Sequence, residues 1–150
     1  MKTFFFALMF CSFLSNAQES KIVYDSTLAK KLKADKNGMK KYVLAILKTG
    51  PKDSLIKGSR RDSLFSGHMK NINRLAEEGM LAVAGPFGKN SQEYRGLFIL
   101  NVKSVEEAKR LCESDPTIKE GIFLIDLFEW YGSAALLETT RIHKTLEKQN

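Results

Sequence analysis

Short apolar runs bounded by charged or turn-forming residues recur four times along the chain, at residues 41–48, 80–84, 96–102 and 122–130. The first run holds six consecutive apolar residues, Tyr42 to Leu47, and is closed by Thr49-Gly50-Pro51. Continuous runs of this length that end at glycine and proline are typical of buried strands. The pattern therefore predicts four β-strands.

Between these runs the apolar positions follow a helical period. From Asp62 to Glu78 they fall three or four residues apart, which predicts an amphipathic helix that ends at a left-handed Gly79. These positions are Leu64, Phe65, Met69, Ile72, Leu75 and Ala76. A second helix is predicted to begin after Ser104, whose spacing to Glu107 is that of a capping box.

The order of these elements predicts the fold class. After about Glu113 the chain restarts at Ser114-Asp115-Pro116 as a turn or short helix, and a terminal helix is predicted over 133–147. The core order is β-α-β-β-α-β, the ferredoxin-like pattern of an α+β fold with an antiparallel four-stranded sheet. Two helices cover one face of such a sheet, yet both faces are apolar. We therefore expect a homodimer through the second face, with the terminal helix as the alternative cover.

The N-terminal 17 residues have the pattern of a secretory signal peptide: Lys2 precedes an apolar run, and small residues lead to a cleavage site after Ala17. The run is shorter than the roughly 20 residues of a membrane span. We therefore expect export to the periplasm or the exterior without a stable membrane anchor. After cleavage Cys112 is the remaining cysteine, so no intramolecular disulfide forms, and its helical neighbours predict a buried small hydrophobe.

Length and composition favour one folded domain, because 43% of the 150 residues are hydrophobic. We assign residues 18–39 to a polar lead, 40–132 to the domain, and 133–150 to a terminal helix and tail. Six lysines that contribute to the formal charge of +7 gather in the lead and at the start of the domain, at Lys30, Lys31, Lys33, Lys36, Lys40 and Lys41. No nucleic-acid-binding motif accompanies these lysines, so a solvated face is favoured and no nucleic-acid partner is expected. Contact with anionic envelope components is the alternative.

His68 and Asp115 are the candidate catalytic residues. His68 lies four residues after Leu64 and four before Ile72, so it is on the apolar face of its helix and points toward the sheet. Asp115 before Pro116 is also a common helix start. If the two side chains meet, the carboxylate orients the imidazole and stabilises its charged form. If they do not, His68 is a core histidine.

Four further residues are candidates for binding a small molecule. Arg95 can hold an anionic group, Pro86 and Phe87 lie where a strand ends, and Trp130 can wall a pocket. Each also has a structural interpretation as a surface, turn or core residue. Asp126, alone among apolar neighbours, predicts an edge position for its strand. There is no metal-ligand spacing, phosphate loop or serine elbow, so we expect neither a metal site nor a cofactor.

Several short motifs in this order resemble the YCII-related family over about residues 40–132. They are Tyr42-Val43-Leu44, Gly67-His68-Met69, Arg74 to Gly79, Ala84-Gly85-Pro86-Phe87, Arg95 to Phe98, Val105 to Ala108, Asp115-Pro116 and Trp130-Tyr131-Gly132. The resemblance implies a ferredoxin-like fold, a dimeric α/β barrel and a His-Asp pair at His68 and Asp115. One relative is linked to dehydrochlorination of a chlorinated aromatic, whereas most have no assigned reaction.

These observations favour a small exported enzyme in which His68 transfers a proton during elimination or isomerisation of a small cyclic or phenolic compound. Asp115 orients His68, and Arg95 binds an anionic or enolic group. The alternative is a dimeric module that binds a small ligand without chemistry.

Overall fold

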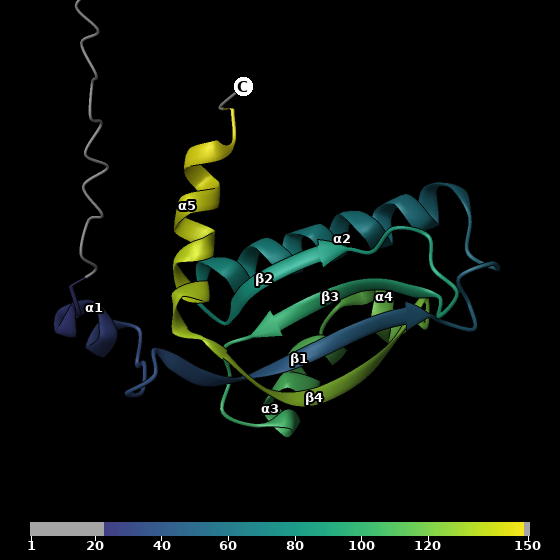
Figure 1. The fold of residues 1–150 in the computed structure, drawn as a ribbon. Helices are drawn as coiled ribbons and strands as arrows, with labels where there is room; N and C mark the ends of the chain where they lie inside the picture. The colour runs from purple at the N-terminus through teal and green to yellow at the C-terminus, as the bar shows by residue number, and fades with distance from the viewer. Residues whose placement is uncertain (1–22, 149–150) are drawn as a thin grey trace, which may run out of the picture.

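The computed structural model describes residues 23–148, which are built around one antiparallel sheet (Figure 1). Its strands are β1 (Met39–Thr49), β2 (Leu81–Pro86), β3 (Tyr94–Leu100) and β4 (Phe123–Ser133). They lie in the order β2-β3-β1-β4, and all neighbours are antiparallel. Together with the element order along the chain, this confirms the α+β, ferredoxin-like prediction. The edge position of β4 confirms the expectation for Asp126.

Helices cover one face of this sheet. They are α2 (Gly58–Glu77), α3 (Val105–Glu113) and α4 (Pro116–Glu120). The short helix α1 (Ser26–Lys31) precedes β1, and a 3-10 turn η1 (Ala134–Glu138) and α5 (Thr139–Leu146) follow β4. In Figure 1, α2 lies along β2, while α3 and α4 lie behind the strands of the sheet. Gly79 follows α2 with φ +69°, as predicted for a left-handed cap. The helix begins four residues before the predicted Asp62.

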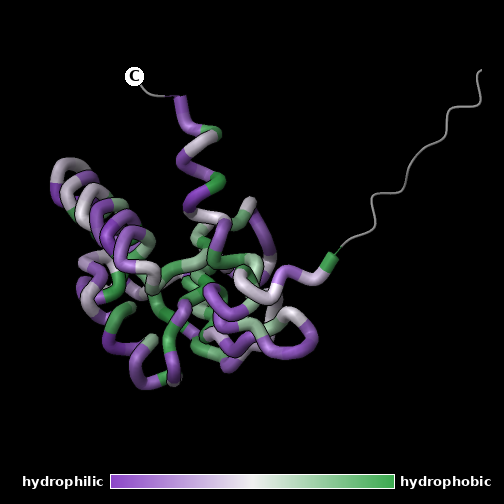
Figure 2. Tube along the Cα trace, turned by 90° about the vertical axis from the view of Figure 1, so that its left-hand side faces the viewer, coloured by the Kyte–Doolittle hydropathy of each residue, from purple (hydrophilic) through white to green (hydrophobic). Residues whose placement is uncertain are grey.

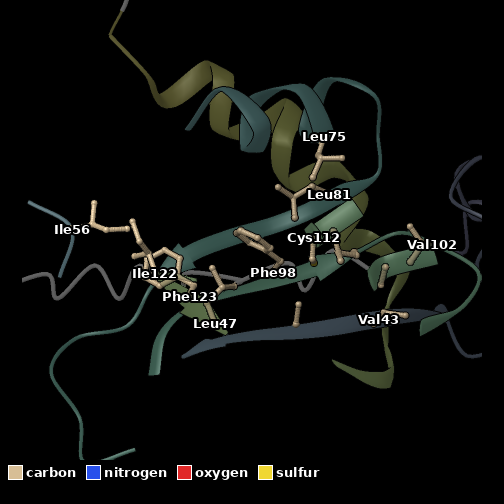
Figure 3. Close-up of a cluster of buried hydrophobic side chains, with 13 residues drawn as sticks. Val43, Leu47, Ile56, Leu75, Leu81, Phe98, Val102, Cys112, Ile122 and Phe123 are labelled. Atoms are coloured by element: carbon tan, nitrogen blue, oxygen red, sulfur yellow. The ribbon is translucent and has the colours of Figure 1, made fainter. Parts of the chain in front are cut away.

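The hydrophobic core lies between the sheet and these helices (Figure 3). Alternate β1 residues Val43, Ala45 and Leu47 point into it, because successive side chains of a strand face opposite sides. From α3 they meet Cys112, which is 2% exposed. Burial raises the pKa of the Cys112 thiol to about 12, so this cysteine is the buried small residue that the pattern predicted.

The intervening β1 residues point to the opposite, open face of the sheet. Leu44 and Ile46 lie there, and the register places Phe128 and Asp126 directly beside them on β4. Phe128 is 51% exposed, and Asp126 Oδ2 pairs with Lys48 Nζ at 2.6 Å. The described residues thus leave an apolar sheet face uncovered, with one ion pair in it.

The terminal segment differs from its prediction. The single helix expected over 133–147 is divided into η1 and α5, because the chain first forms a tight turn whose Ala134 amide donates to Gly38 O at 2.9 Å. The helix α5 then stands beside β2 and the end of α2 (Figure 1). The terminal helix therefore lies on the helical side and does not cover the open face.

The lead contains a short helix that the sequence pattern did not indicate. Asp25 caps α1, and Lys31 Nζ joins Glu138 Oε1 at 3.0 Å. The hydropathy view in Figure 2 shows this N-terminal region as largely hydrophilic. Residues 1–17, the expected signal peptide, lie outside the described residues. Among residues 23–148 no helix is long and apolar enough to span a membrane.

Candidate functional site

His68 is held in the middle of α2 by an aromatic cage. The residue is 9% exposed, and the centroid of its ring lies 6.1 Å from that of Phe65, 6.1 Å from that of Phe98 and 5.7 Å from that of Phe123. These rings come from the helix itself and from two strands, so the helical spacing correctly predicted that His68 points toward the sheet. An imidazole in this setting needs a polar partner, because burial of an unpaired polar group is costly.

Asp115 provides that partner from the start of α4. It is fully buried, and as the N-cap its Oδ1 accepts from the Thr117 amide at 2.9 Å and the Thr117 hydroxyl at 2.5 Å. Pro116 occupies the first helical position, where its missing amide hydrogen costs nothing. The interpretation of Asp115 as a helix cap is thus correct, and the cap contacts occupy one carboxylate oxygen, Oδ1.

The other oxygen, Oδ2, lies 2.8 Å from His68 Nδ1. It also accepts from Asn71 Nδ2 at 3.2 Å, one helical turn after His68. The contact requires α2 and α4 to approach closely, and Gly67 permits this approach. A Cβ at Gly67 would lie 2.8 Å from Pro116 Cγ, which is too close for two carbon atoms.

The charge of Asp115 determines which nitrogen of His68 carries hydrogen. Burial raises the pKa of the Asp115 carboxyl, but hydrogen bonds from His68 and Thr117 and the charge of His68 outweigh burial, so its pKa lies below the ordinary aspartate value. An ionised carboxylate only accepts, so Nδ1 of His68 must donate to it. In the neutral ring Nε2 therefore carries a lone pair. Nε2 has no hydrogen-bond partner among residues 23–148. Since every buried side-chain nitrogen and oxygen of these residues does have a partner, Nε2 is an accessible atom.

His68 forms part of the wall of a cavity of about 630 Å³ between α2, β2, β3 and α5. Arg95, Pro86 and Phe87, all predicted from the sequence, line it as well. Its apolar wall includes Phe65, Met69, Ile72, Phe98 and Phe123. The structure therefore brings together a basic nitrogen, an aromatic wall and an arginine.

Arg95 belongs to a positively charged cluster at this cavity. Asp53 Oδ1 binds Arg61 Nη2 at 2.7 Å, and Asp53 Oδ2 lies 3.6 Å from Arg95 Nη1. Because two guanidinium groups share one carboxylate, these three residues keep a net positive charge. The Arg61 guanidinium also lies 4.8 Å from the centre of the Phe65 ring. The cluster can attract an anionic group to the aromatic wall.

The model of the YCII-related domain matches residues 42–131 of this chain. The chain belongs to the YCII-related domain family. It is 31% identical over 65 residues to the uncharacterized protein YjpA of Bacillus subtilis, covering 43% of this chain and 73% of that protein.

A solved structure, the 5-chloro-2-hydroxyhydroquinone dehydrochlorinase of Burkholderia phenoliruptrix AC1100 in complex with 2,5-dihydroxybenzoquinone, is also similar. It is 22% identical, with a TM-score of 0.43, and the match covers 59% of this chain and 92% of that one.

Trp130, the fourth predicted binding residue, lies at the end of the YCII-related domain and does not line the cavity. The β1–β4 register pairs it with Tyr42, and the two rings are 5.8 Å apart. This position is on the open face, opposite the helices. Residues 23–148 hold no group of three or more His, Cys, Asp or Glu side chains arranged for a metal ion.

Sequence reasoning missed three parts of the site. The first two are Asn71 and Thr117, which donate hydrogen bonds to Asp115. Asn71 lies three residues after His68 and Thr117 two residues after Asp115, and these spacings could have indicated both contacts. The third is α5, beyond the YCII-related domain match, which lines the cavity with Thr139, Thr140, His143 and Glu147. These residues belong to the terminal helix predicted over 133–147, and no local pattern indicates where that helix packs.

Proposed function

We propose that this YCII-related domain binds a small cyclic or phenolic compound in the cavity and that His68 transfers a proton on it, with Asp115 as the positioning residue. One observation carries the proposal. His68 Nδ1 is fixed to the buried Asp115 carboxylate at 2.8 Å, which leaves Nε2 as the nitrogen able to act at the cavity. An oriented imidazole beside a carboxylate is the usual arrangement of a general base.

The step uses groups of this chain alone. Nε2 of neutral His68 takes a proton from a C–H or O–H of the bound compound, and the electron pair of that bond moves into the compound. In elimination a leaving group departs with the electron pair of its bond, and His68 then releases its proton to the leaving group or to solvent. In isomerisation the same proton returns to another atom of the compound. The Asp115 carboxylate stabilises the imidazolium formed in between.

Arg95 and the aromatic wall support a phenolic or enolic ligand. The Arg95 cluster has a net positive charge, which stabilises negative charge on an oxygen of the compound. Phe65 and Phe98 present apolar ring surfaces to the same space. These features favour a flat compound with an anionic or readily ionised oxygen.

The test is turnover in a screen of halogenated and non-halogenated phenols, hydroquinones and cyclic acids. We expect His68→Ala to reduce any activity found by about 10²–10⁴-fold, the usual contribution of a general base. The matched control is Trp130→Phe, which changes an aromatic residue outside the cavity and should keep the activity. Turnover of His68→Ala at the wild-type rate refutes the proposal, and saturable binding without turnover across the panel supports a ligand-binding module instead.

We further propose that the open face pairs with that of a second copy. Leu44, Ile46 and Phe128 form an apolar surface there, and such surfaces on soluble proteins commonly mark interfaces. Light scattering should give the mass of a dimer, and Phe128→Arg should give that of a monomer. Lys119→Ala on the opposite side is the control. A monomeric wild type contradicts this pairing.

The N-terminal pattern supports export as a further part of the proposal. Fractionation of cells that produce the full chain should place it outside the cytoplasm, in a form shortened near Ala17. Deletion of residues 4–14 should retain it in the cytoplasm at full remaining length.

A further inference from the structure

The helix α5 extends the cavity with a polar wall. Thr139 and His143 lie four residues apart on one face of the helix, Glu147 follows at the same spacing as its C-cap, and all three line the cavity with Thr140. This segment follows residue 131, where the match to the YCII-related domain ends. The wall is therefore supplied by the part of the chain outside that domain.

The polarity of α5 is the reverse of what core packing favours. Its apolar residues Ile142 and Leu146 are 48% and 75% exposed, while the face toward the cavity is hydrophilic. A helix that served to cover a hydrophobic core would turn its apolar side inward. The orientation of α5 instead matches a cavity that holds a polar group at this end.

His143 and Glu147 are paired but accessible. His143 Nε2 lies 3.3 Å from Glu147 Oε1, and their side chains are 65% and 59% exposed. An exposed ion pair of this kind adds little to stability. The pair presents both a donor and an acceptor to the cavity, which suits a hydroxyl group of a ligand.

Arg95 and α5 lie at opposite ends of β2. Arg95 precedes Gly96, which pairs with Pro86 at the end of β2. The turn η1 is joined to Gly38, just before β1, at the end of the sheet where Leu81 begins β2. His68 lines the same cavity on the α2 side. A ligand that reaches from Arg95 to α5 therefore passes along the wall that contains His68.

We propose that α5 determines the ligand specificity of this cavity. Its His143–Glu147 pair binds a hydroxyl group at the far end of an elongated aromatic acid whose carboxylate lies at Arg95. This inference rests on the proposed function, because it concerns the ligand of the same cavity. It adds the chemical class of that ligand and the residues that select it.

The test compares two probes, phenylpropionate and its para-hydroxylated analogue, by calorimetric titration of the full chain. We expect wild type to bind the hydroxylated acid about fivefold more tightly, the effect of roughly one hydrogen bond. The double variant His143→Ala/Glu147→Ala should bind both acids equally, with the affinity of wild type for phenylpropionate. Lys144→Ala, on the same helix but outside the cavity wall, should keep the preference.

The outcomes separate this inference from the proposed function. A preference that persists in the double variant, or that is absent from wild type while both acids bind, overturns the role of α5 and leaves the His68 proposal standing. Failure of wild type to bind either acid overturns the ligand class and the role of α5 with it. Unchanged melting temperatures of the variants are expected, because both replaced side chains are largely exposed.

Discussion

Replacement of Asp115 by asparagine should reverse the tautomer of His68. The Asp115 carboxylate accepts from His68 Nδ1, Asn71 Nδ2, the Thr117 amide and the Thr117 hydroxyl. Asparagine has one acceptor oxygen, and two donors of Thr117 hold it at the cap. Its amide nitrogen then faces His68 Nδ1, which must accept, so the ring hydrogen moves to Nε2. The nitrogen at the cavity changes from a proton acceptor to a donor.

The same change should destabilise the fold. A hydrogen bond to a charged group contributes about 1.5–3 kcal/mol, and a buried donor left without an acceptor costs about 1–3 kcal/mol. In Asp115→Asn the bond to His68 loses its charge, and Asn71 Nδ2 is left facing another donor. We expect the free energy of unfolding to fall by about 2–4 kcal/mol at neutral pH.

This loss should depend on pH in one direction. The folded pKa of the Asp115 carboxyl is lowered, so its charge stabilises the fold at every pH above the unfolded value of about 3.9. The stabilisation is lost as the pH falls through the folded pKa. The difference between wild type and Asp115→Asn that comes from this carboxylate charge should therefore shrink below about pH 4.

Urea unfolding followed by the fluorescence of Trp130, the single tryptophan, measures the free energy at several pH values. Nitrogen-15 NMR of the imidazole identifies the protonated nitrogen. The control is Asp126→Asn, whose partly exposed pair with Lys48 should contribute less than about 1 kcal/mol. Equal stability of Asp115→Asn and wild type at neutral pH, or an Nε2 that stays unprotonated in the variant, would refute the reasoning.

Three further predictions follow from the packing. Gly67→Ala should lower the free energy of unfolding by about 1–3 kcal/mol, because the added Cβ would meet Pro116; Gly88→Ala, in open space, is the control in denaturant titrations. Cys112, with a thiol pKa of about 12, should resist iodoacetamide at pH 8 until urea unfolds the chain, and rapid labelling of Cys112 itself in the native protein would contradict this. Arg95→Gln should weaken binding of phenylpropionate about tenfold in titration calorimetry, the effect of about one charge-assisted hydrogen bond, and unchanged affinity would remove Arg95 from the site.

Hydropathy predicted the existence and order of the strands but not their full lengths. β1 and β4 pair from Met39 opposite Ser133 to Thr49 opposite Phe123. The first part of this ladder contains Met39 and Lys40, which lie before the predicted run of residues 41–48. Backbone pairing extends β1 there, because hydrogen bonds between strands require no particular side chain. The division of the terminal segment into η1 and α5 likewise depends on a backbone contact to Gly38.

The direction of His68 could be predicted because it depends on helical spacing within one element. Its contact with Asp115 joins residues 47 positions apart, and no local pattern fixes such a distance. The contact depends on how closely α2 approaches α4, and therefore on the absence of a side chain at Gly67. The face on which Trp130 lies depends in the same way on contacts between elements, since a one-residue change in register moves a strand residue to the other face of the sheet.

The helix cap and the candidate base share one carboxylate, and this links the fold to the chemistry. Thr117 holds Oδ1 at the start of α4, which fixes the position of the whole group. Oδ2 is thereby presented to His68 without any freedom of its own to rotate. A carboxylate held at both oxygens fixes the imidazole more firmly than a mobile side chain would, because no ordering entropy remains to be lost when a ligand enters. Thr117→Val should therefore reduce turnover while Asp115 and His68 are both still present, and restored turnover in Thr117→Ser would assign the effect to the hydroxyl.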